Sequence, residues 1–114
     1  MWTDVDGDGL RRLLAERPEL QLLDVRTPGE YVGLGHVPGA TLRPVQLIHE
    51  WADTLDAAKP VALLCQHGVR SVHACQWLAQ QGFRELYNLA GGMSVYEGDL
   101  AYDPSPDFPI SALG

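Results

Sequence analysis

The chain has 114 residues, of which 46% are hydrophobic and 20% are charged, and these proportions indicate one globular domain with a single core. Eight Lys and Arg residues against 15 Asp and Glu residues give a formal net charge of -7, which argues against nucleic-acid binding through a basic surface. No apolar run approaches the roughly 20 residues of a membrane span, and the acidic N-terminus does not resemble a secretory signal. We therefore expect a cytoplasmic protein that binds neither nucleic acid nor membranes, with its two cysteines reduced.

The first half of the chain predicts a helix, two strands and a long loop. Leucines at helical spacing over residues 8–16 predict a helix that ends before Pro18. The apolar residues 20–25 predict a buried strand, and residues 41–42 predict a second, shorter one. The glycines and prolines between residues 30 and 39 favour a segment that is mostly loop.

The second half predicts helices and strands in alternation. An apolar stripe through residues 45–55 predicts a helix, and residues 61–64, apolar at every position, predict a central strand covered on both faces. A further helix over residues 71–81 is closed by Gly82, and residues 86–89 predict another strand. This alternation predicts an α/β fold, a three-layer sandwich with a mostly parallel central sheet of about five strands. We assign residues 1–100 to a single domain and residues 101–114 to a proline-containing C-terminal extension.

Cys65 stands where the most apolar predicted strand ends, and only residues 66–70 separate it from the predicted helix. Ligands of parallel α/β proteins bind beyond the carboxyl ends of the strands, commonly at the N-terminus of the next helix. Gly68 permits a positive φ in so short a turn, so consecutive backbone N–H groups can face inward. We expect this cradle to hold an anion and to lower the pKa of the Cys65 thiol. A buried core thiol is the alternative at this position.

Several polar side chains are expected near this cradle. Arg70 can close one side of it as a fixed positive charge, and Ser71 can cap the helix with its hydroxyl near the sulfur. Asp24 and Arg26 follow a neighbouring buried strand, and we expect a structural pair that supports the loop in preference to a catalytic role. Glu30 is expected to order the turn-rich segment by hydrogen bonding.

Two patterns resemble metal sites, and neither is complete. Residues 4–9 match the first half of a calcium loop, but its twelfth position is Ala15 where a glutamate is required. Capping of the first helix by an aspartate explains the pattern better. A zinc site would use two cysteines and two histidines at a spacing unusual for zinc: Cys65, His67, His73 and Cys75. We expect Cys75 to be a core thiol and the protein to need no metal and no cofactor.

Four short motifs occur in the order found in one protein family. CQHGVRS (residues 65–71) resembles the active-site loop of single-domain rhodaneses, C-x-x-G-x-R-S. LLDVRTPGEY (22–31), GHVPGA (35–40) and NLAGG (88–92) resemble the D-V-R-x-x-x-E-[YF], G-H-I-P-G-A and N-L-x-G-G signatures of that family. The resemblance covers roughly residues 8 to 98, and it identifies the chain as similar to rhodanese-like sulfurtransferases. Tyr96 stands where the family usually has a tryptophan.

The resemblance implies a thiosulfate sulfurtransferase, or rhodanese. In that family the loop cysteine takes a sulfane sulfur from an anionic donor such as thiosulfate and carries it as a persulfide. A thiophilic acceptor, such as cyanide or a thiol, then removes the sulfur. By this likeness Cys65 is the nucleophile and Arg70 binds the donor, while the other loop residues form the substrate cradle: Gln66, His67, Gly68, Val69 and Ser71. Gln66 and His67 are expected to influence the choice of donor and acceptor.

Two other functions stay open. Single-domain rhodaneses resemble persulfide-carrier modules with little turnover of their own, and the partner would then be a sulfur-accepting protein. The related phosphatases and arsenate reductases have an active-site loop that is one residue longer and surrounds a tetrahedral anion. The six residues from Cys65 to Arg70 favour sulfur transfer over phosphate or arsenate chemistry.

Overall fold

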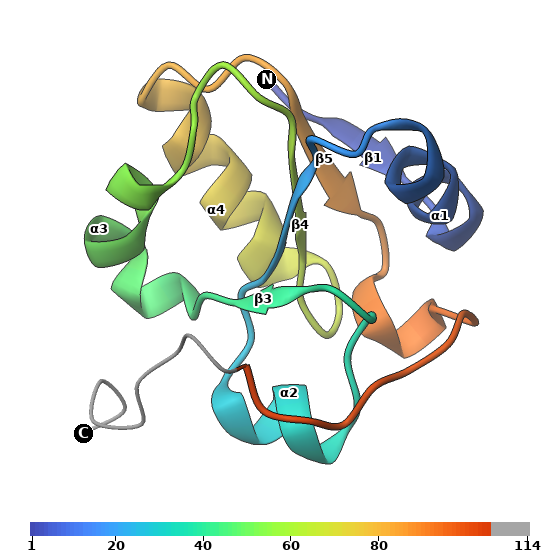
Figure 1. Cartoon of the computed structure of the whole chain (residues 1–114). Coiled ribbons are helices and arrows are strands. Elements are labelled where there is room, and N and C mark those ends of the chain that lie inside the picture. The colour runs from blue at the N-terminus through green and yellow to red at the C-terminus, as the bar shows by residue number, and fades with distance from the viewer. Residues whose placement is uncertain (106–114) are drawn as a thin grey trace.

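A parallel sheet of five strands lies at the centre of residues 1–105, the part of the chain that the computed structural model describes (Figure 1). The strands follow the spatial order β1-β5-β4-β2-β3, and each neighbouring pair runs parallel. Their bounds are Thr3–Val5 (β1), Gln21–Asp24 (β2), Thr41–Leu42 (β3), Val61–Leu64 (β4) and Leu86–Leu89 (β5). All four residues of β4 are buried at the middle of the sheet, as their unbroken apolar run predicts.

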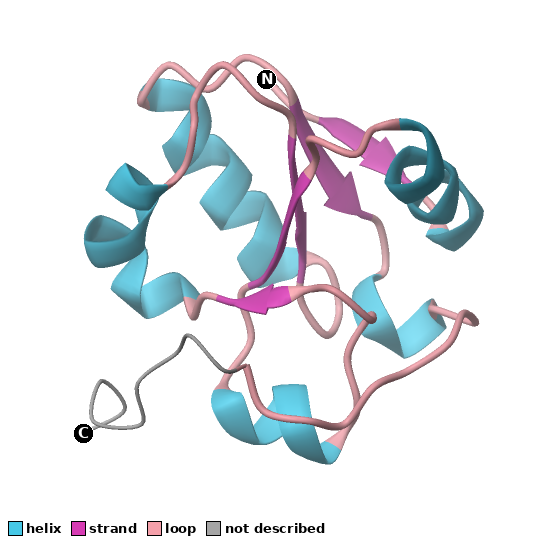
Figure 2. Ribbon diagram, viewed as in Figure 1, coloured by secondary structure: helices cyan, strands magenta, loops and turns pink. Residues whose placement is uncertain are grey.

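Helices cover both faces of this sheet (Figure 2). They are α1 (Gly7–Glu16), α2 (Pro28–Gly33), α3 (Ile48–Trp51) and α4 (Val69–Gln80), with the 3₁₀ turns η1 (Val45–Leu47), η2 (Ala52–Thr54) and η3 (Gly92–Val95). Successive residues of β4 point to opposite faces, so Leu63 joins the core beneath α3 and α4 and Leu64 joins the core beneath α1. The predicted three-layer α/β sandwich with a parallel sheet is confirmed.

Most of the predicted elements are confirmed within a residue. The short strands over residues 41–42, 61–64 and 86–89 have the predicted bounds, and the strand predicted over 20–25 extends from Gln21 to Asp24. The first helix begins at Gly7, and the side chain of Asp6 accepts a hydrogen bond from the Gly9 N–H. This aspartate cap is the interpretation that the sequence favoured over a calcium loop. The sequence did not predict β1, which is three residues long, largely exposed and paired only with β5.

The predictions for two segments that connect strands, residues 30–39 and 45–55, were wrong in part. Residues 30–39 were expected to be mostly loop, but α2 extends to Gly33. A capping box explains this helix, because Thr27 and Glu30 satisfy each other's backbone N–H groups and Pro28 occupies the first turn. The continuous helix predicted over 45–55 is instead broken into η1, α3 and η2, since the backbone departs from helical geometry at Leu47 and the chain tightens into a 3₁₀ turn at Ala52.

The register of the sheet brings two loops to the same edge. Asp24 at the end of β2 lies beside Leu64 at the end of β4. The Val25 N–H then donates to the Leu64 carbonyl at 2.9 Å. Because the two strands are parallel neighbours, the loops that follow them lie side by side, and Arg26 contacts Gln66 at 2.8 Å.

The turn after β5 clamps the loop after β4 from the other side. The N–H groups of Met93 and Ser94 in η3 donate to the carbonyls of Cys65 and Gln66, each at 2.9 Å. Gly92 makes this approach possible, because its φ is +67° and a Cβ there would lie 2.4 Å from the Cys65 carbonyl oxygen.

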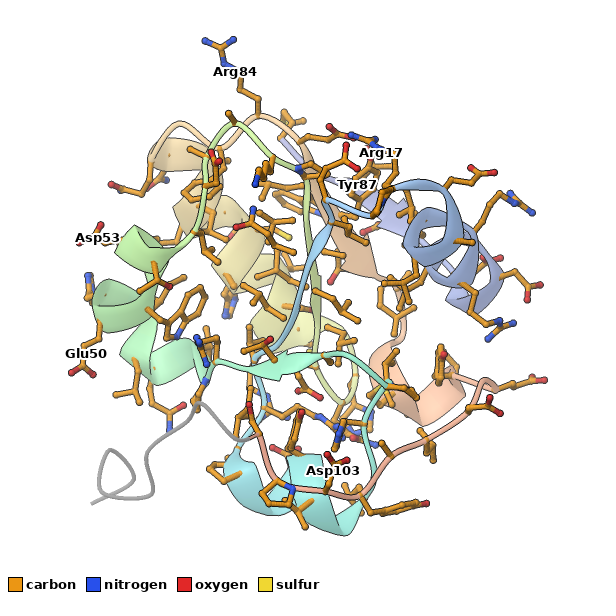
Figure 3. The ribbon with its side chains drawn as sticks, viewed as in Figure 1. Arg17, Glu50, Asp53, Arg84, Tyr87 and Asp103 are labelled. Atoms are coloured by element: carbon orange, nitrogen blue, oxygen red, sulfur yellow. The ribbon has the colours of Figure 1, made fainter. Side chains whose placement is uncertain are left out.

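The end of the described chain packs over α2. His36 and Ala101 form an antiparallel bridge, and the imidazole of His36 stacks on the ring of Tyr31 with 3.5 Å between centroids. Asp103, labelled beside α2 in Figure 3, lies 3.5 Å from the imidazole of His36. Residues 101–105 thus contact the domain, residues 106–114 lie outside the described residues, and the boundary at residue 100 stays a prediction. Among the described residues, no helix is long and apolar enough to span a membrane.

Two glycine substitutions test the clamp. Gly92→Ala should lower the free energy of unfolding by about 3 kcal/mol, because it adds a clash with the Cys65 carbonyl to the strain of a positive φ. Gly82→Ala is the matched control, since its φ is +95° and no atom lies within 4 Å of an added Cβ; its cost should be about 1 kcal/mol. Urea unfolding measures both, and equal losses would contradict the clamp.

Candidate active site

Cys65 is the first residue of a tight turn that connects β4 to α4 (Figure 1). Its side chain is 1% exposed. Gly68 has a φ of +90° and is the N-cap residue of α4, which confirms the expected positive φ. The helix therefore begins at Val69, two residues earlier than predicted. The expectation that Ser71 caps the helix was wrong, because Ser71 lies within the first turn of α4.

Hydrogen-bond donors converge on the sulfur of Cys65. The backbone N–H groups of Gly68 and Ser71 donate to Sγ at 3.1 and 3.3 Å. The Ser71 hydroxyl lies 3.3 Å from the same sulfur, as expected from the sequence. This hydroxyl also donates to the side-chain oxygen of Asn88 at 2.5 Å. The side-chain NH₂ of Asn88 in turn donates to the carboxylate of Asp4 at 3.0 Å. Sequence reasoning did not single out Asn88 as a site residue, although it opens the NLAGG motif.

These contacts decide the ionisation of Cys65. Burial opposes the thiolate, but the Ser71 hydroxyl and the backbone N–H groups of Ser71, Gly68 and His67 outweigh it, so the pKa of Cys65 is lowered. Cys75 has the opposite environment. Burial in the core raises the pKa of Cys75 to about 12, so of the two thiols Cys65 ionises more readily.

A buried ion pair supports the loop from the β2 side. Both side chains of Asp24 and Arg26 are fully buried. The Arg26 guanidinium donates to both carboxylate oxygens of Asp24, to the Gly35 carbonyl at 2.8 Å and to the side-chain oxygen of Gln66 at 2.8 Å. The pair therefore has the geometry of a support for the loop. Gln66 is thereby held inward, whereas the side chain of His67 is exposed.

Arg70 is paired with a carboxylate from a different element. Its guanidinium donates to both oxygens of Glu30, at 2.7 and 2.8 Å. Glu30 does order the N-terminus of α2, as expected, because it also accepts from the N–H and hydroxyl of Thr27. Sequence reasoning missed the pair with Arg70, since 40 positions separate the two residues and no local pattern connects them.

Valine side chains border the loop on its solvent side. Val69 and Val95 are each 61% exposed, and Val95 packs over Gly91, whose backbone N lies beside Gly68. Within residues 1–105 no group of three or more His, Cys, Asp and Glu side chains could hold a metal ion. The arrangement as a whole is a buried thiol that faces the N–H groups of Gly68 and Ser71 and the Ser71 hydroxyl.

The Ser71 hydroxyl can be tested through the ionisation of Cys65. The rate of alkylation by iodoacetamide should rise with pH around a midpoint below the ordinary thiol value of about 8.5. Ser71→Ala should move that midpoint upward by about half to one pH unit, because a donor to the thiolate is lost. Ser94→Ala is the control, since its hydroxyl donates to the Gly91 carbonyl and does not contact the sulfur. An unchanged midpoint in Ser71→Ala would show that the backbone donors alone suffice.

Comparison with known proteins places this geometry in a family. A family model described as "Rhodanese-like domain" matches residues 8–99. The chain is 34% identical to a "Sulfurtransferase" of Allochromatium vinosum, over 84% of this chain and 89% of that protein. It is 31% identical to the "Thiosulfate sulfurtransferase GlpE" of Coxiella burnetii, over 82% of this chain and 84% of that protein. The crystal structure of a rhodanese-like domain protein from Staphylococcus aureus superposes with a TM-score of 0.79 at 27% identity, over 89% of this chain and 98% of that one. The chain belongs to the rhodanese-like domain family.

Proposed function

We propose that this protein is a sulfurtransferase that moves a sulfane sulfur from an anionic donor such as thiosulfate to a thiophilic acceptor through a Cys65 persulfide. The observation that carries the proposal is the set of N–H and hydroxyl donors aimed at a buried sulfur, all of them within the loop from Cys65 to Ser71 that also contains Arg70. The names of the two relatives, a sulfurtransferase and a thiosulfate sulfurtransferase, support it.

The first half-reaction loads the enzyme. The Cys65 thiolate attacks the outer sulfur of thiosulfate, a new S–S bond forms, and the bond to the sulfonate sulfur breaks. Sulfite leaves with the bonding electron pair, and Cys65 carries a persulfide anion. The N–H groups of Gly68 and Ser71, which already hold the thiolate, are placed to stabilise this charge as it shifts to the new sulfur.

The second half-reaction removes the transferred sulfur from Cys65. Cyanide or a thiolate attacks the outer sulfur of the persulfide, and the S–S bond to Cys65 breaks. The electron pair returns to Cys65, which regenerates the thiolate. No general base is required in either half, because the lowered pKa of Cys65 favours its thiolate. Both cysteines among the described residues are free, which fits our proposal of a reducing, cytoplasmic location.

Substitution of Cys65 tests the proposal. Wild-type protein should form thiocyanate from thiosulfate and cyanide, and intact mass should show one added sulfur after incubation with thiosulfate. Cys65→Ser should lose both signals, since a hydroxyl does not form a persulfide. Cys75→Ala should keep both, because the Cys75 thiol is buried in the core. Retention of turnover in Cys65→Ser would overturn the assignment.

The same experiment separates the alternatives. A persulfide-carrier module that serves a sulfur-accepting protein would gain the extra sulfur on Cys65 but release it slowly to cyanide and to small thiols. A phosphatase would hydrolyse an aryl phosphate in a manner that depends on Cys65. We expect no such hydrolysis, because the loop has the length associated with sulfur chemistry.

A further inference from the structure

We propose that Glu30 selects the sulfur donor: by occupying Arg70, it favours persulfides, whose transferable sulfur carries at most one negative charge, over dianionic thiosulfate. The inference rests on the proposed sulfur transfer at Cys65 and concerns the charge of the donor-binding site. Its starting point is the contact between Glu30 on α2 and Arg70 in the first turn of α4.

Glu30 is held firmly against Arg70. The two groups meet in a bidentate pair with both N–O distances below 3 Å. Thr27 anchors the same carboxylate through its N–H and its hydroxyl, at 3.0 and 3.1 Å. The Arg70 guanidinium, followed by these Thr27 contacts, lowers the pKa of Glu30 to about 2, so the carboxylate stays ionised at every physiological pH. An incoming anion would have to compete with a fixed negative charge for Arg70.

The second arginine of the site offers no free charge either. Arg26 is fully buried, and its guanidinium is matched by the Asp24 carboxylate. Its remaining contacts go to the carbonyl of Gly35 and the side chain of Gln66. Both arginines of the site are thus balanced by carboxylates, and the positive potential at the Cys65 sulfur comes from the backbone N–H groups and the Ser71 hydroxyl.

This charge balance discriminates between donors. Thiosulfate brings two negative charges toward a thiolate and a carboxylate, in a chain whose formal net charge is -7. A persulfide R–S–SH needs no cation for binding. The Cys65 thiolate attacks its terminal sulfur, the S–S bond of the donor breaks, and R–S⁻ leaves with the electron pair and then takes a proton from water. The product is the same Cys65 persulfide, in its protonated form.

The test compares two donors and one substitution. Single-turnover loading of Cys65, followed by rapid alkylation and intact mass, gives a rate constant for thiosulfate and for hydroxyethyl persulfide, a donor without a carboxylate. Glu30→Gln should load from thiosulfate about tenfold faster than wild type, because Arg70 gains an unbalanced charge. Loading from hydroxyethyl persulfide should change less than about twofold. Glutamine is accepted in a capping box, so α2 is expected to persist, and circular dichroism checks this.

Matched variants assign the effect to the pair. Glu50→Gln removes a carboxylate that points away from the protein on α3 (Figure 3) and should load from both donors like wild type. The double variant Glu30→Gln, Arg70→Gln should lose the gain with thiosulfate, because the gain depends on the arginine. Wild-type protein supplies a further measurement: sulfate, an unreactive dianion, should not slow loading from hydroxyethyl persulfide.

The outcomes separate this inference from the function on which it rests. If neither donor adds sulfur to Cys65 of wild-type protein, the proposed sulfur transfer itself fails. If both donors load Cys65 but folded Glu30→Gln shows no selective gain with thiosulfate, the transfer stands and the role of Glu30 is overturned. Strong inhibition of wild type by sulfate would overturn it as well, since it would reveal a dianion site that Glu30 does not block.

Discussion

The hydrogen bonds from backbone N–H groups to the sulfur of Cys65 are the interaction on which the site depends. Burial alone would keep this thiol neutral, as it does at Cys75, whose pKa is raised to about 12. At Cys65 the donors of Gly68 and Ser71 reverse that effect and lower the pKa. The lowered pKa therefore depends on where the loop places its backbone N–H groups and the Ser71 hydroxyl, and the structure around the loop holds them there.

Three neighbouring parts of the chain hold the Cys65 loop in place. Backbone N–H groups of η3 donate hydrogen bonds to the carbonyls of Cys65 and Gln66. The buried Arg26 donates to the side chain of Gln66, and the side-chain oxygen of Asn88 accepts from the Ser71 hydroxyl. Arg26 follows β2, Asn88 lies in β5 and η3 follows β5, and β2 and β5 are the two neighbours of β4 in the sheet. A parallel sheet thus supplies both the strand end that carries the nucleophile and the neighbours that shape its loop. The charged side chains are also paired by the fold, because Arg26 contacts Asp24 and Arg70 contacts Glu30.

Sequence patterns predicted the elements whose signals are local. The apolar run of β4 and the glycine at position 68 predicted a central strand and a positive φ, and both are confirmed. The capping box at Thr27 was equally local, but the many glycines and prolines around it favoured a loop and hid α2. β1 could not be predicted, since three largely exposed residues have no periodicity and form a strand only because β5 is beside them.

The sequence by itself determined the fold class, the family resemblance and the identity of Cys65 as the candidate nucleophile, because these depend on residues adjacent in the chain. The tertiary structure decided what Arg70 faces. From the sequence it is a cation in the loop just before a predicted helix, available to an anionic donor. In the fold, α2 places Glu30 against it, 40 positions away. Such a pairing arises from the packing of distant elements, and local propensity and periodicity carry no information about it.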